Sequence, residues 1–277
     1  AARREVMIAL AACTLGIALL NWLEFFYPLA TNAFDCRAVG TYINPNSAAY
    51  ALVFGMLAGL RAFSDRARAW FVVIIGISIL PTYSRSGMII YLGAMLVLLA
   101  SGMVCWRRLM RPALAGIVAT ALLFSLAFMN VAGRLDCVSH AVVDRAKVIF
   151  AFSADRVESD FSTQERIFLL RNAFSAYRAN WLFGEGLGAT WVQGNGQRTH
   201  NIYLEKGIEM GVIGLLLWPA FLLLLMFSCH GQSRQLACVL LSSGLALGLF
   251  SHNLFESRQI VIAAALLLVT STEKQPI

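Results

Sequence analysis

Long apolar stretches alternate with short polar segments along most of the chain. The apolar stretches cover roughly residues 6–23, 46–60, 70–84, 86–104, 113–130, 208–228, 236–252 and 258–271. A helix needs about 20 mostly apolar residues to cross the hydrocarbon core of a bilayer, and tilt or partial burial accommodates shorter ones. The pattern therefore predicts an all-α, polytopic membrane protein with about eight transmembrane helices.

Composition agrees with this pattern. Hydrophobic residues make up 59% of the 277 residues and charged residues only 13%, and the mean hydropathy is +0.70. These values exclude an ordinary soluble globular domain. The first apolar stretch is too long for a secretory signal peptide and lacks a small-residue cleavage site, so we expect it to remain as a helix.

Basic residues in the short connections predict the orientation. If the helices alternate, one side receives Arg3, Arg4, Arg61, Arg66, Arg68, Arg107, Arg108, Arg111, Arg234 and Lys274. An excess of arginine and lysine on short loops marks the cytoplasmic side. The other side then receives residues 24–45, 83–87, 131–207 and 252–258. The chain divides accordingly into transmembrane helices 1–5 (residues 1–130), a long non-cytoplasmic loop with its own helix (131–207) and transmembrane helices 6–8 (208–277).

The polar stretch from 160 to 217 holds most of the side chains that can do chemistry. Ser162 and Glu165 have the spacing of a capping box, which predicts a helix start there. Arg166 then falls in the first turn, where free N–H groups and the macrodipole favour an anion. An apolar stripe follows, made of Ile167, Leu170, Phe174, Tyr177 and Trp181, with Arg171 and Arg178 along its edge. A glycine-rich turn at 184–188 ends the helix.

Two arginines are candidates for binding an anion. Arg85 lies in a polar turn between two apolar stretches. An arginine at membrane depth is costly and usually faces a polar cavity or a partner, although one at a helix end also reaches lipid headgroups. Arg166 is either an anion-binding residue or a solvated charge on an amphipathic helix. Guanidinium groups match phosphate oxygens well, so a lipid-borne phosphate or diphosphate is the ligand class that we expect.

Histidine and cysteine complete the set of candidates. His200 precedes an apolar helix, and a helix N-terminus favours the neutral imidazole, so it suits a general base; the alternative is a capping or interfacial histidine. His252 and Arg258 fall on the same side and could line the same cavity. Cys36 and Cys137 are also on that side, where a disulfide between them or two free thiols are both possible. Neither the cysteines nor the histidines have metal-ligand spacing, so we expect no metal site.

Six short motifs, taken in order, resemble one family. They are Asn44-Pro45-Asn46, Ser84-Arg85-Ser86-Gly87, Ser162-x-x-x-Arg166, Trp181-Leu-Phe-Gly184-x-Gly186-x-Gly188, His200-Asn201-x-Tyr203-Leu204-Glu205 and Glu209-x-Gly211-Val-Ile-Gly214. Their order and their placement relative to the apolar stretches resemble the O-antigen ligase and polymerase superfamily of bacterial envelope glycan assembly, of the lipid A-core:surface polymer ligase type. Family members usually have several helices ahead of the Asn-Pro-Asn motif. One apolar stretch precedes it here, so we expect the usual N-terminal helices to be lacking, either because the sequence begins late or because this is a compact member.

The resemblance implies a function for the site. It implies an inverting, metal-independent glycosyltransferase of lipopolysaccharide biosynthesis that needs no cofactor. The glycan would pass from undecaprenyl diphosphate to lipid A-core at the periplasmic face of the bacterial inner membrane. By the resemblance, Arg85 and Arg166 bind the donor diphosphate, and His200 activates or orients the acceptor hydroxyl. Weaker candidates for substrate binding are Arg171, Asn201, Tyr203, His252 and Arg258.

The expected partners are therefore the lipid-linked donor, the lipid A-core acceptor and membrane lipid, and no nucleic acid. Two neighbouring functions remain alternatives: a polymerase of O-antigen or exopolysaccharide, and a protein O-oligosaccharide ligase. A transporter of lipid-linked glycans is an alternative from another class. A transporter would carry charge along a central cavity, whereas here the apolar stretches are nearly uncharged and the charge gathers at one face, which favours an enzyme.

Overall fold

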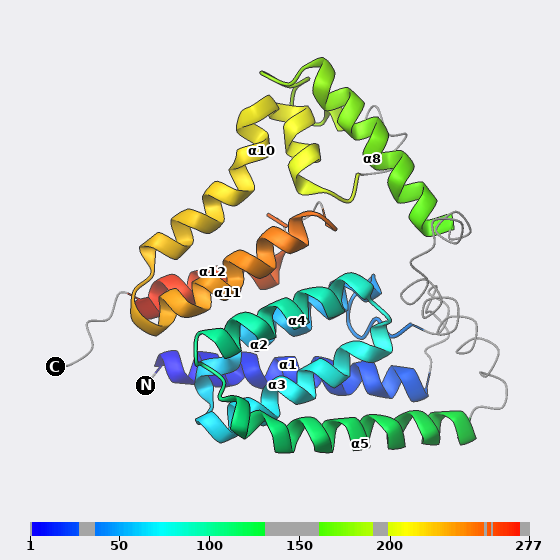
Figure 1. Ribbon diagram of the computed structural model, residues 1–277, viewed down its shortest axis with the longest axis vertical. Coiled ribbons are helices and arrows are strands. Elements are labelled where there is room, and N and C mark those ends of the chain that lie inside the picture. The colour runs from blue at the N-terminus through cyan, green and yellow to red at the C-terminus, as the bar shows by residue number, and fades with distance from the viewer. Residues whose placement is uncertain are drawn as a thin grey trace.

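The computed structural model describes residues 2–27, 37–130, 161–190, 199–251, 254–255 and 257–271, and the regular elements in these ranges are all helices (Figure 1). The α-helices are α1 (Ala2–Phe26), α2 (Pro45–Gly59), α3 (Asp65–Ile79), α4 (Arg85–Ala100), α5 (Trp106–Asn130), α8 (Phe161–Ala179), α10 (Ile202–Ser228), α11 (Gly231–Gly248) and α12 (Arg258–Ser271). Two 3₁₀ turns, η1 (Leu60–Ala62) and η2 (Leu80–Thr82), follow α2 and α3. For this part of the chain the all-α prediction is confirmed, and each predicted apolar stretch forms a helix.

In the described part of the chain, fewer helices than predicted are long enough to span a bilayer on their own. The segments Arg4–Phe26, Trp106–Ser125 and Ile202–Ser228 meet the length and hydropathy of a membrane span, while Arg85–Ala100 and Arg258–Val269 are shorter apolar helices. Helices α2 and α3 have 15 residues each. A helix of that length rises about 22 Å, which is less than the hydrocarbon thickness of about 30 Å. The number of eight spans therefore stays a prediction.

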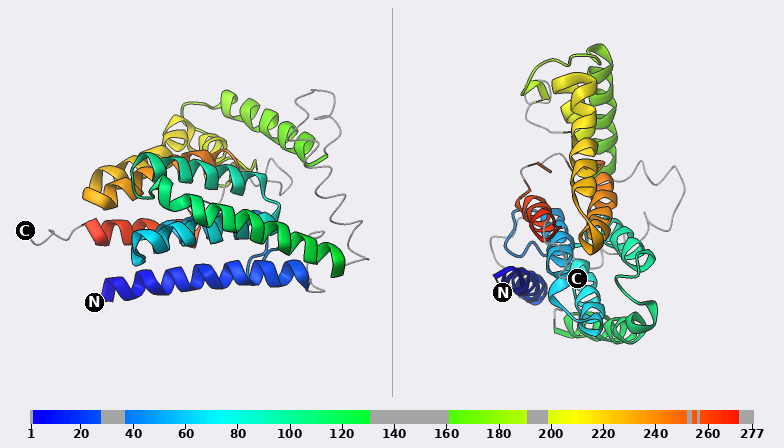
Figure 2. Two further views of the ribbon diagram at one scale, coloured as in Figure 1. Left: turned by 60° about the horizontal axis from the view of Figure 1, so that its bottom comes forward. Right: turned by 90° about the vertical axis from the view of Figure 1, so that its left-hand side faces the viewer.

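Helices α1 to α5 pack with α11 and α12 into a bundle and run roughly along a common direction (Figure 2), whereas α8 and the upper part of α10 stand away from it (Figure 1). Helix α2 is its centre: it contacts α1, α3, α4 and α12. Its side chains are buried on all sides, as expected for a helix that is hydrophobic all round. Gly59 allows close packing there, because a Cβ at this position would lie 2.9 Å from the Cα of Ala11 on α1.

The connections rich in arginine gather at one end of the bundle. Arg61 of η1 donates a hydrogen bond of 2.8 Å to the hydroxyl of Ser233 on α11. Arg108, at the start of α5, pairs with Asp65 at the start of α3. The predicted alternation of the helices thus agrees with the packing of these connections. Which side of a membrane this end faces stays a prediction.

Two helix boundaries differ from the predictions. Helix α8 begins at Phe161, so Ser162 lies inside its first turn instead of capping it. Helix α10 begins at Ile202, directly after His200 and Asn201 as the sequence indicates, but it is broken at Gly211 (φ 62°, ψ −146°), whereas the sequence predicts a continuous span over 208–228. These angles are open to glycine and hardly to any other residue. Figure 1 shows the part before the break meeting the long remainder of α10 at a sharp angle.

Candidate functional site

The starts of α2 and α4 lie together at the end of the bundle opposite the arginine-rich connections. Ser84 caps α4: its hydroxyl oxygen accepts a bond of 3.1 Å from the N–H of Gly87 and donates one of 2.7 Å to Oδ1 of Asn46, in the first turn of α2. Ser84 is fully buried. Arg85 follows this cap directly and is half-buried. The two hydrogen bonds of the Ser84 hydroxyl thus fix the backbone that carries Arg85.

A second arginine joins these two helix starts. Arg37 donates from Nη2 to Oδ1 of Asn46 (3.2 Å) and from Nε to the carbonyl of Thr82 (3.0 Å). The guanidinium group of Arg37 therefore lies at the N-termini of α2 and α4, and Arg85 is the first residue of α4, so this place favours an anion. Sequence reasoning missed Arg37. The signal was present, since Arg37 is the one basic residue in the predicted non-cytoplasmic segment 24–45.

Removing the hydroxyl of Ser84 tests how much this junction contributes to stability. Ser84→Ala deletes the N-cap of α4 and the bond to Asn46, so we expect a loss of about 1–2 kcal/mol of unfolding free energy. The matched control is Ser125→Ala, whose exposed hydroxyl bonds only to Ala121 of its own helix in the described contacts. Thermal unfolding midpoints in detergent measure both. Equal midpoints for the two variants would contradict a structural role for the junction.

The glycine turn after α8 docks on the break in α10. The N–H groups of Glu185 and Gly186 donate to the carbonyls of Ile208 (2.8 Å) and Glu209 (3.1 Å). A Cβ on Gly184 would lie 2.5 Å from the backbone of Glu209, and one on Gly211 would lie 2.2 Å from the carbonyl oxygen of Leu182. Backbone therefore packs directly on backbone, and this contact requires glycine on both sides.

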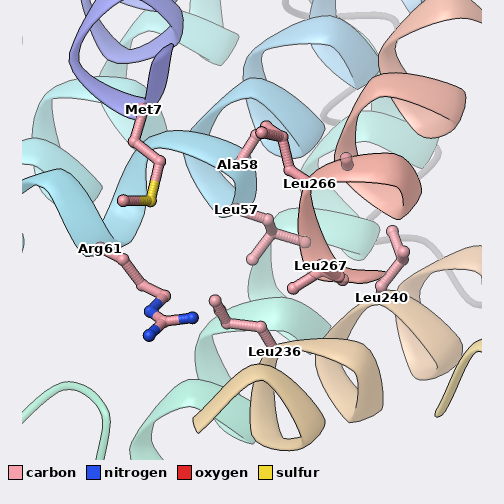
Figure 3. A pocket seen from close by; sticks show the side chains of 9 residues that line it. Met7, Leu57, Ala58, Arg61, Leu236, Leu240, Leu266 and Leu267 are labelled. Carbon is pink, nitrogen blue, oxygen red and sulfur yellow. The ribbon is translucent and has the colours of Figure 1, made fainter. Parts of the chain in front are cut away.

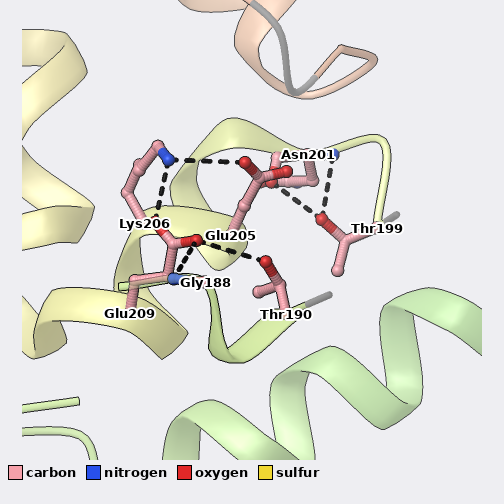
Figure 4. Close-up of polar contacts among 7 residues, drawn as sticks. All are labelled: Gly188, Thr190, Thr199, Asn201, Glu205, Lys206 and Glu209. Carbon is pink, nitrogen blue, oxygen red and sulfur yellow. Dashed lines mark hydrogen bonds and ion pairs between the residues drawn. The ribbon is translucent and has the colours of Figure 1, made fainter. Parts of the chain in front are cut away.

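A buried carboxylate secures the same contact (Figure 4). Oε1 of Glu209 accepts bonds from the N–H of Gly188 (3.2 Å) and the hydroxyl of Thr190 (3.3 Å), and Oε2 accepts one of 2.8 Å from the ammonium of Lys206. Lys206 also lies 3.4 Å from Oε1 of Glu205. Glu209 is only 6% exposed, so the three donors offset the cost of burying its charge. Sequence reasoning placed Glu205 and Glu209 in two of the motifs but did not predict that they form a group with Lys206.

His200 stands at the start of the helix that this group secures. Its backbone is left-handed (φ 51°), which is uncommon outside glycine. On one side the Thr199 hydroxyl accepts a bond of 3.4 Å from the N–H of Asn201, and on the other Oδ1 of Asn201 caps the helix by accepting from Leu204 (3.1 Å). The imidazole is exposed. The local turn thus holds His200 outward at a helix N-terminus.

The three predicted catalytic residues come from three elements connected by packing. Arg166 lies in α8, whose bounds the structure gives, although its side chain is outside the described part. Helix α8 packs on α10, α10 on α11, and α11 on α4. The elements that carry Arg166 and His200 are therefore in direct contact, and the element that carries Arg85 is joined to them through α11. A single site formed by all three side chains stays a prediction.

One comparison identifies the family. The family model described as O-antigen ligase matches residues 70–218, which is more than half of the chain. The chain belongs to the O-antigen ligase family. The resemblance inferred from the short motifs is thereby confirmed, and the match covers Arg85, Arg166 and His200. Comparison with curated proteins and with solved structures gave no match. Family membership and the long apolar helices together indicate a helical membrane protein with a ligase- or polymerase-type function.

The structure gives the remaining candidates of this family member local roles. The Asn201 side chain is the N-cap of α10, and the Tyr203 hydroxyl donates to the carbonyl of Leu245 (2.8 Å), which fastens α10 to α11. Arg171 and Arg258 are exposed, on α8 and at the start of α12. Their substrate-binding roles stay predictions. His252, Cys36 and Cys137 lie outside the described residues.

A small hollow at the other end of the bundle does not belong to this site (Figure 3). It is lined by Met7, Leu57, Ala58, Arg61, Leu236, Leu240, Ala263, Leu266 and Leu267. All of these are apolar except Arg61, and this end carries the arginine-rich connections. Within the described ranges, no three His, Cys, Asp or Glu side chains gather closely enough to hold a metal ion.

Proposed function

We propose that this member of the O-antigen ligase family is an inverting glycosyltransferase. It transfers a glycan from undecaprenyl diphosphate to lipid A-core at the periplasmic face of the bacterial inner membrane. The observation that carries the proposal is the junction at the start of α4. There Arg37 and Arg85 stand at two converging helix N-termini, an arrangement that suits a diphosphate at the membrane surface.

In the proposed reaction the oxygen of an acceptor hydroxyl attacks the anomeric carbon of the glycan. The bond from that carbon to the diphosphate oxygen breaks, and undecaprenyl diphosphate leaves with the electron pair. Attack from the face opposite the leaving group inverts the configuration. Arg85 and Arg166 stabilise the charge that develops on the diphosphate, and positioned cations of this kind are usually the largest single contribution to such a step.

His200 receives or orients the hydroxyl proton in this scheme. It stands directly before the first turn of α10, and its exposure places it at the surface, where an acceptor can approach. Because diphosphate is a good leaving group, orientation of the hydroxyl contributes alongside proton transfer.

The distribution of charge supports an enzyme over a transporter. The most apolar 18-residue windows of the three long helices contain at most two charged residues each, and the described arginines lie mainly at helix ends and connections. A transporter of anionic lipid-linked glycans needs cationic side chains along its path through the membrane. Among enzymes of this superfamily, the His-Asn-x-Tyr-Leu-Glu motif at 200–205 favours the ligase.

Reconstitution with defined substrates tests the proposal. The purified protein in proteoliposomes receives a lipid-linked glycan donor, with lipid A-core, further lipid-linked donor or pilin-like protein as the acceptor, with and without a chelator. Glycan on lipid A-core in the presence of chelator is the expected result. Longer lipid-linked chains would instead identify a polymerase, and glycosylated pilin a protein ligase. A requirement for added metal would overturn the mechanism.

His200→Ala is the matching variant in that assay. We expect transfer to fall by about 100-fold or more, which is the usual scale of a lost general base. The control is His230→Ala, since His230 is also exposed and also precedes a helix, but stands before α11 at the other end of the bundle. Equal activity of the two variants would remove His200 from the mechanism.

A further inference from the structure

Helix α8 and the turn after it leave a large apolar surface uncovered. It consists of Ile167, Leu170, Phe174, Trp181, Phe183 and Leu187, called here the α8 apolar face. Trp181 is 54% exposed, Phe183 83% and Leu187 82%. Contiguous exposed surface of this kind marks an interaction site in most proteins. The sequence predicts the stripe, and the structure shows that only its edge, around Ala173 and Tyr177, packs on α10.

The α8 apolar face adjoins the membrane-spanning part of α10. The turn touches α10 at Gly211, against Leu182, and at Glu209, against Gly184. Ile213, two residues past the break, is 64% exposed, and it begins the exposed apolar surface of the span. That surface continues through Leu216, Leu217, Leu223, Leu224 and Phe227. Phe183 and Leu187 therefore belong to a turn that contacts α10 close to the first residues of this exposed apolar surface.

Basic side chains border the α8 apolar face. At 100° per residue Arg171 and Arg178 follow one edge of the stripe, and both are exposed. The guanidinium carbon of Arg178 lies 5.7 Å from the centre of the Phe174 ring, within range of a cation–π contact. An apolar face bordered by arginine, with a tryptophan at its end, has the features of a helix lying at a bilayer surface that carries anionic headgroups.

We propose that the α8 apolar face binds the lipid bilayer itself, as an interfacial anchor in the leaflet that α10 enters. The stripe of α8 lies along the headgroup boundary, and the turn 181–187 inserts between acyl chains beside the first turns of the span. Arg171 and Arg178 contact lipid phosphates. This inference requires that α10 spans the membrane, but it does not require the glycan-transfer reaction. It therefore goes beyond the proposed function and does not depend on it.

Spin labels measure the depth of the turn directly. The six cysteines are replaced by serine or alanine in the full chain, and single cysteines at Phe183, Ile213 and Gln232 are labelled in phosphatidylcholine vesicles containing phosphatidylglycerol. Ile213 is the control for lipid, and exposed Gln232, in the first turn of α11, is the control for water. Oxygen is concentrated in lipid, and a nickel complex stays in water, so collision rates with the two report the depth of a label. We expect the label at 183, like the label at 213, to collide more often with oxygen than with the nickel complex. Collision rates at 183 equal to those at 232 would overturn the proposal. Dipolar broadening at 183 would also overturn it, because it would show that a second copy of the chain covers this face.

A fluorescence measurement keeps the native cysteines. Lipids with brominated acyl chains quench tryptophans that reach the hydrocarbon. We expect Trp181→Phe to lower the quenched fraction of the total signal, because Trp181 belongs to the α8 apolar face. The control is Trp218→Phe, since Trp218 is 1% exposed and bonds to the carbonyl of Gly244. An unchanged quenched fraction in Trp181→Phe would contradict insertion of this turn.

Discussion

Arg85→Ala is expected to lower glycan transfer by at least about 100-fold while the protein still folds, since loss of one preorganised charge at a reacting centre usually has this scale. The side chain is half-buried, and the cap that holds its backbone is made by Ser84 and not by Arg85 itself. Arg85→Lys keeps the charge but loses the planar fork that pairs with phosphate oxygens, so it too should be strongly impaired. Transfer rates in proteoliposomes and unfolding midpoints in detergent measure the two effects separately.

The matched control is Arg111→Ala, which removes an exposed arginine from α5 near its start. It should transfer glycan at the normal rate. If Arg85→Ala also keeps its activity while Arg37→Ala loses it, then the diphosphate-binding role belongs to Arg37. Normal activity in both arginine variants would leave the proposed donor site without support.

Gly211→Ala is expected to have the largest effect on stability. The angles at Gly211 are nearly closed to other residues, which alone costs about 1–3 kcal/mol. A Cβ would also lie 2.2 Å from the carbonyl oxygen of Leu182, so the turn after α8 has to move off α10. We expect an unfolding midpoint lower by several degrees, together with increased proteolysis in 182–190.

Gly93→Ala provides the control for a glycine replaced in a helix. Gly93 lies within α4, and a Cβ there meets no atom within 4 Å. Alanine is the better helix former, so this variant should be as stable as the parent or slightly more stable. A midpoint for Gly211→Ala equal to that of Gly93→Ala would show that the break in α10 is not required.

The hydrophobic pattern predicts the bundle well because helix boundaries there depend on local signals. The predicted stretch 46–60 corresponds to Pro45–Gly59, and 86–104 to Arg85–Ala100. In both cases a capping side chain, Asn44 or Ser84, stands directly before the first helical residue. Such caps involve neighbours two or three residues away, so they can be inferred without tertiary information.

The sequence indicates a helix directly after His200, and α10 does begin at Ile202, but the burial of its charged first turns could not be inferred in this way. Glu205, Lys206 and Glu209 indicate a polar connection in the sequence, yet they are buried or half-buried within the helix. They are stable there because they pair with one another and with the turn at 188–190. That compensation comes from residues about 20 positions away, which a local pattern does not contain.

The candidate site was predicted as separate motifs, and the structure shows which of them meet. The Asn-Pro-Asn motif contacts the Ser-Arg-Ser-Gly motif through Asn46 and Ser84, and the glycine turn contacts the Glu209–Gly214 motif. Such pairings depend on long-range packing, which a single sequence does not reveal. For Arg37 the sequence offered only its place as the one basic residue of 24–45, and its contacts with Asn46 and Thr82 show what that place means.

The contact between the glycine turn 184–188 and the first part of α10 determines which segments of this protein can be exchanged with those of a relative. Backbone hydrogen bonds, facing glycines and the Glu209 carboxylate join the segment that carries Arg166 to the one that carries His200. In a chimera that takes only one of these segments from another family member, the two sides of the contact come from different proteins. The contact is too close to accept a mismatched side chain, so such a chimera should pack poorly. Residues 161–214 should therefore be grafted between relatives as one cassette, and acceptor preference should travel with it.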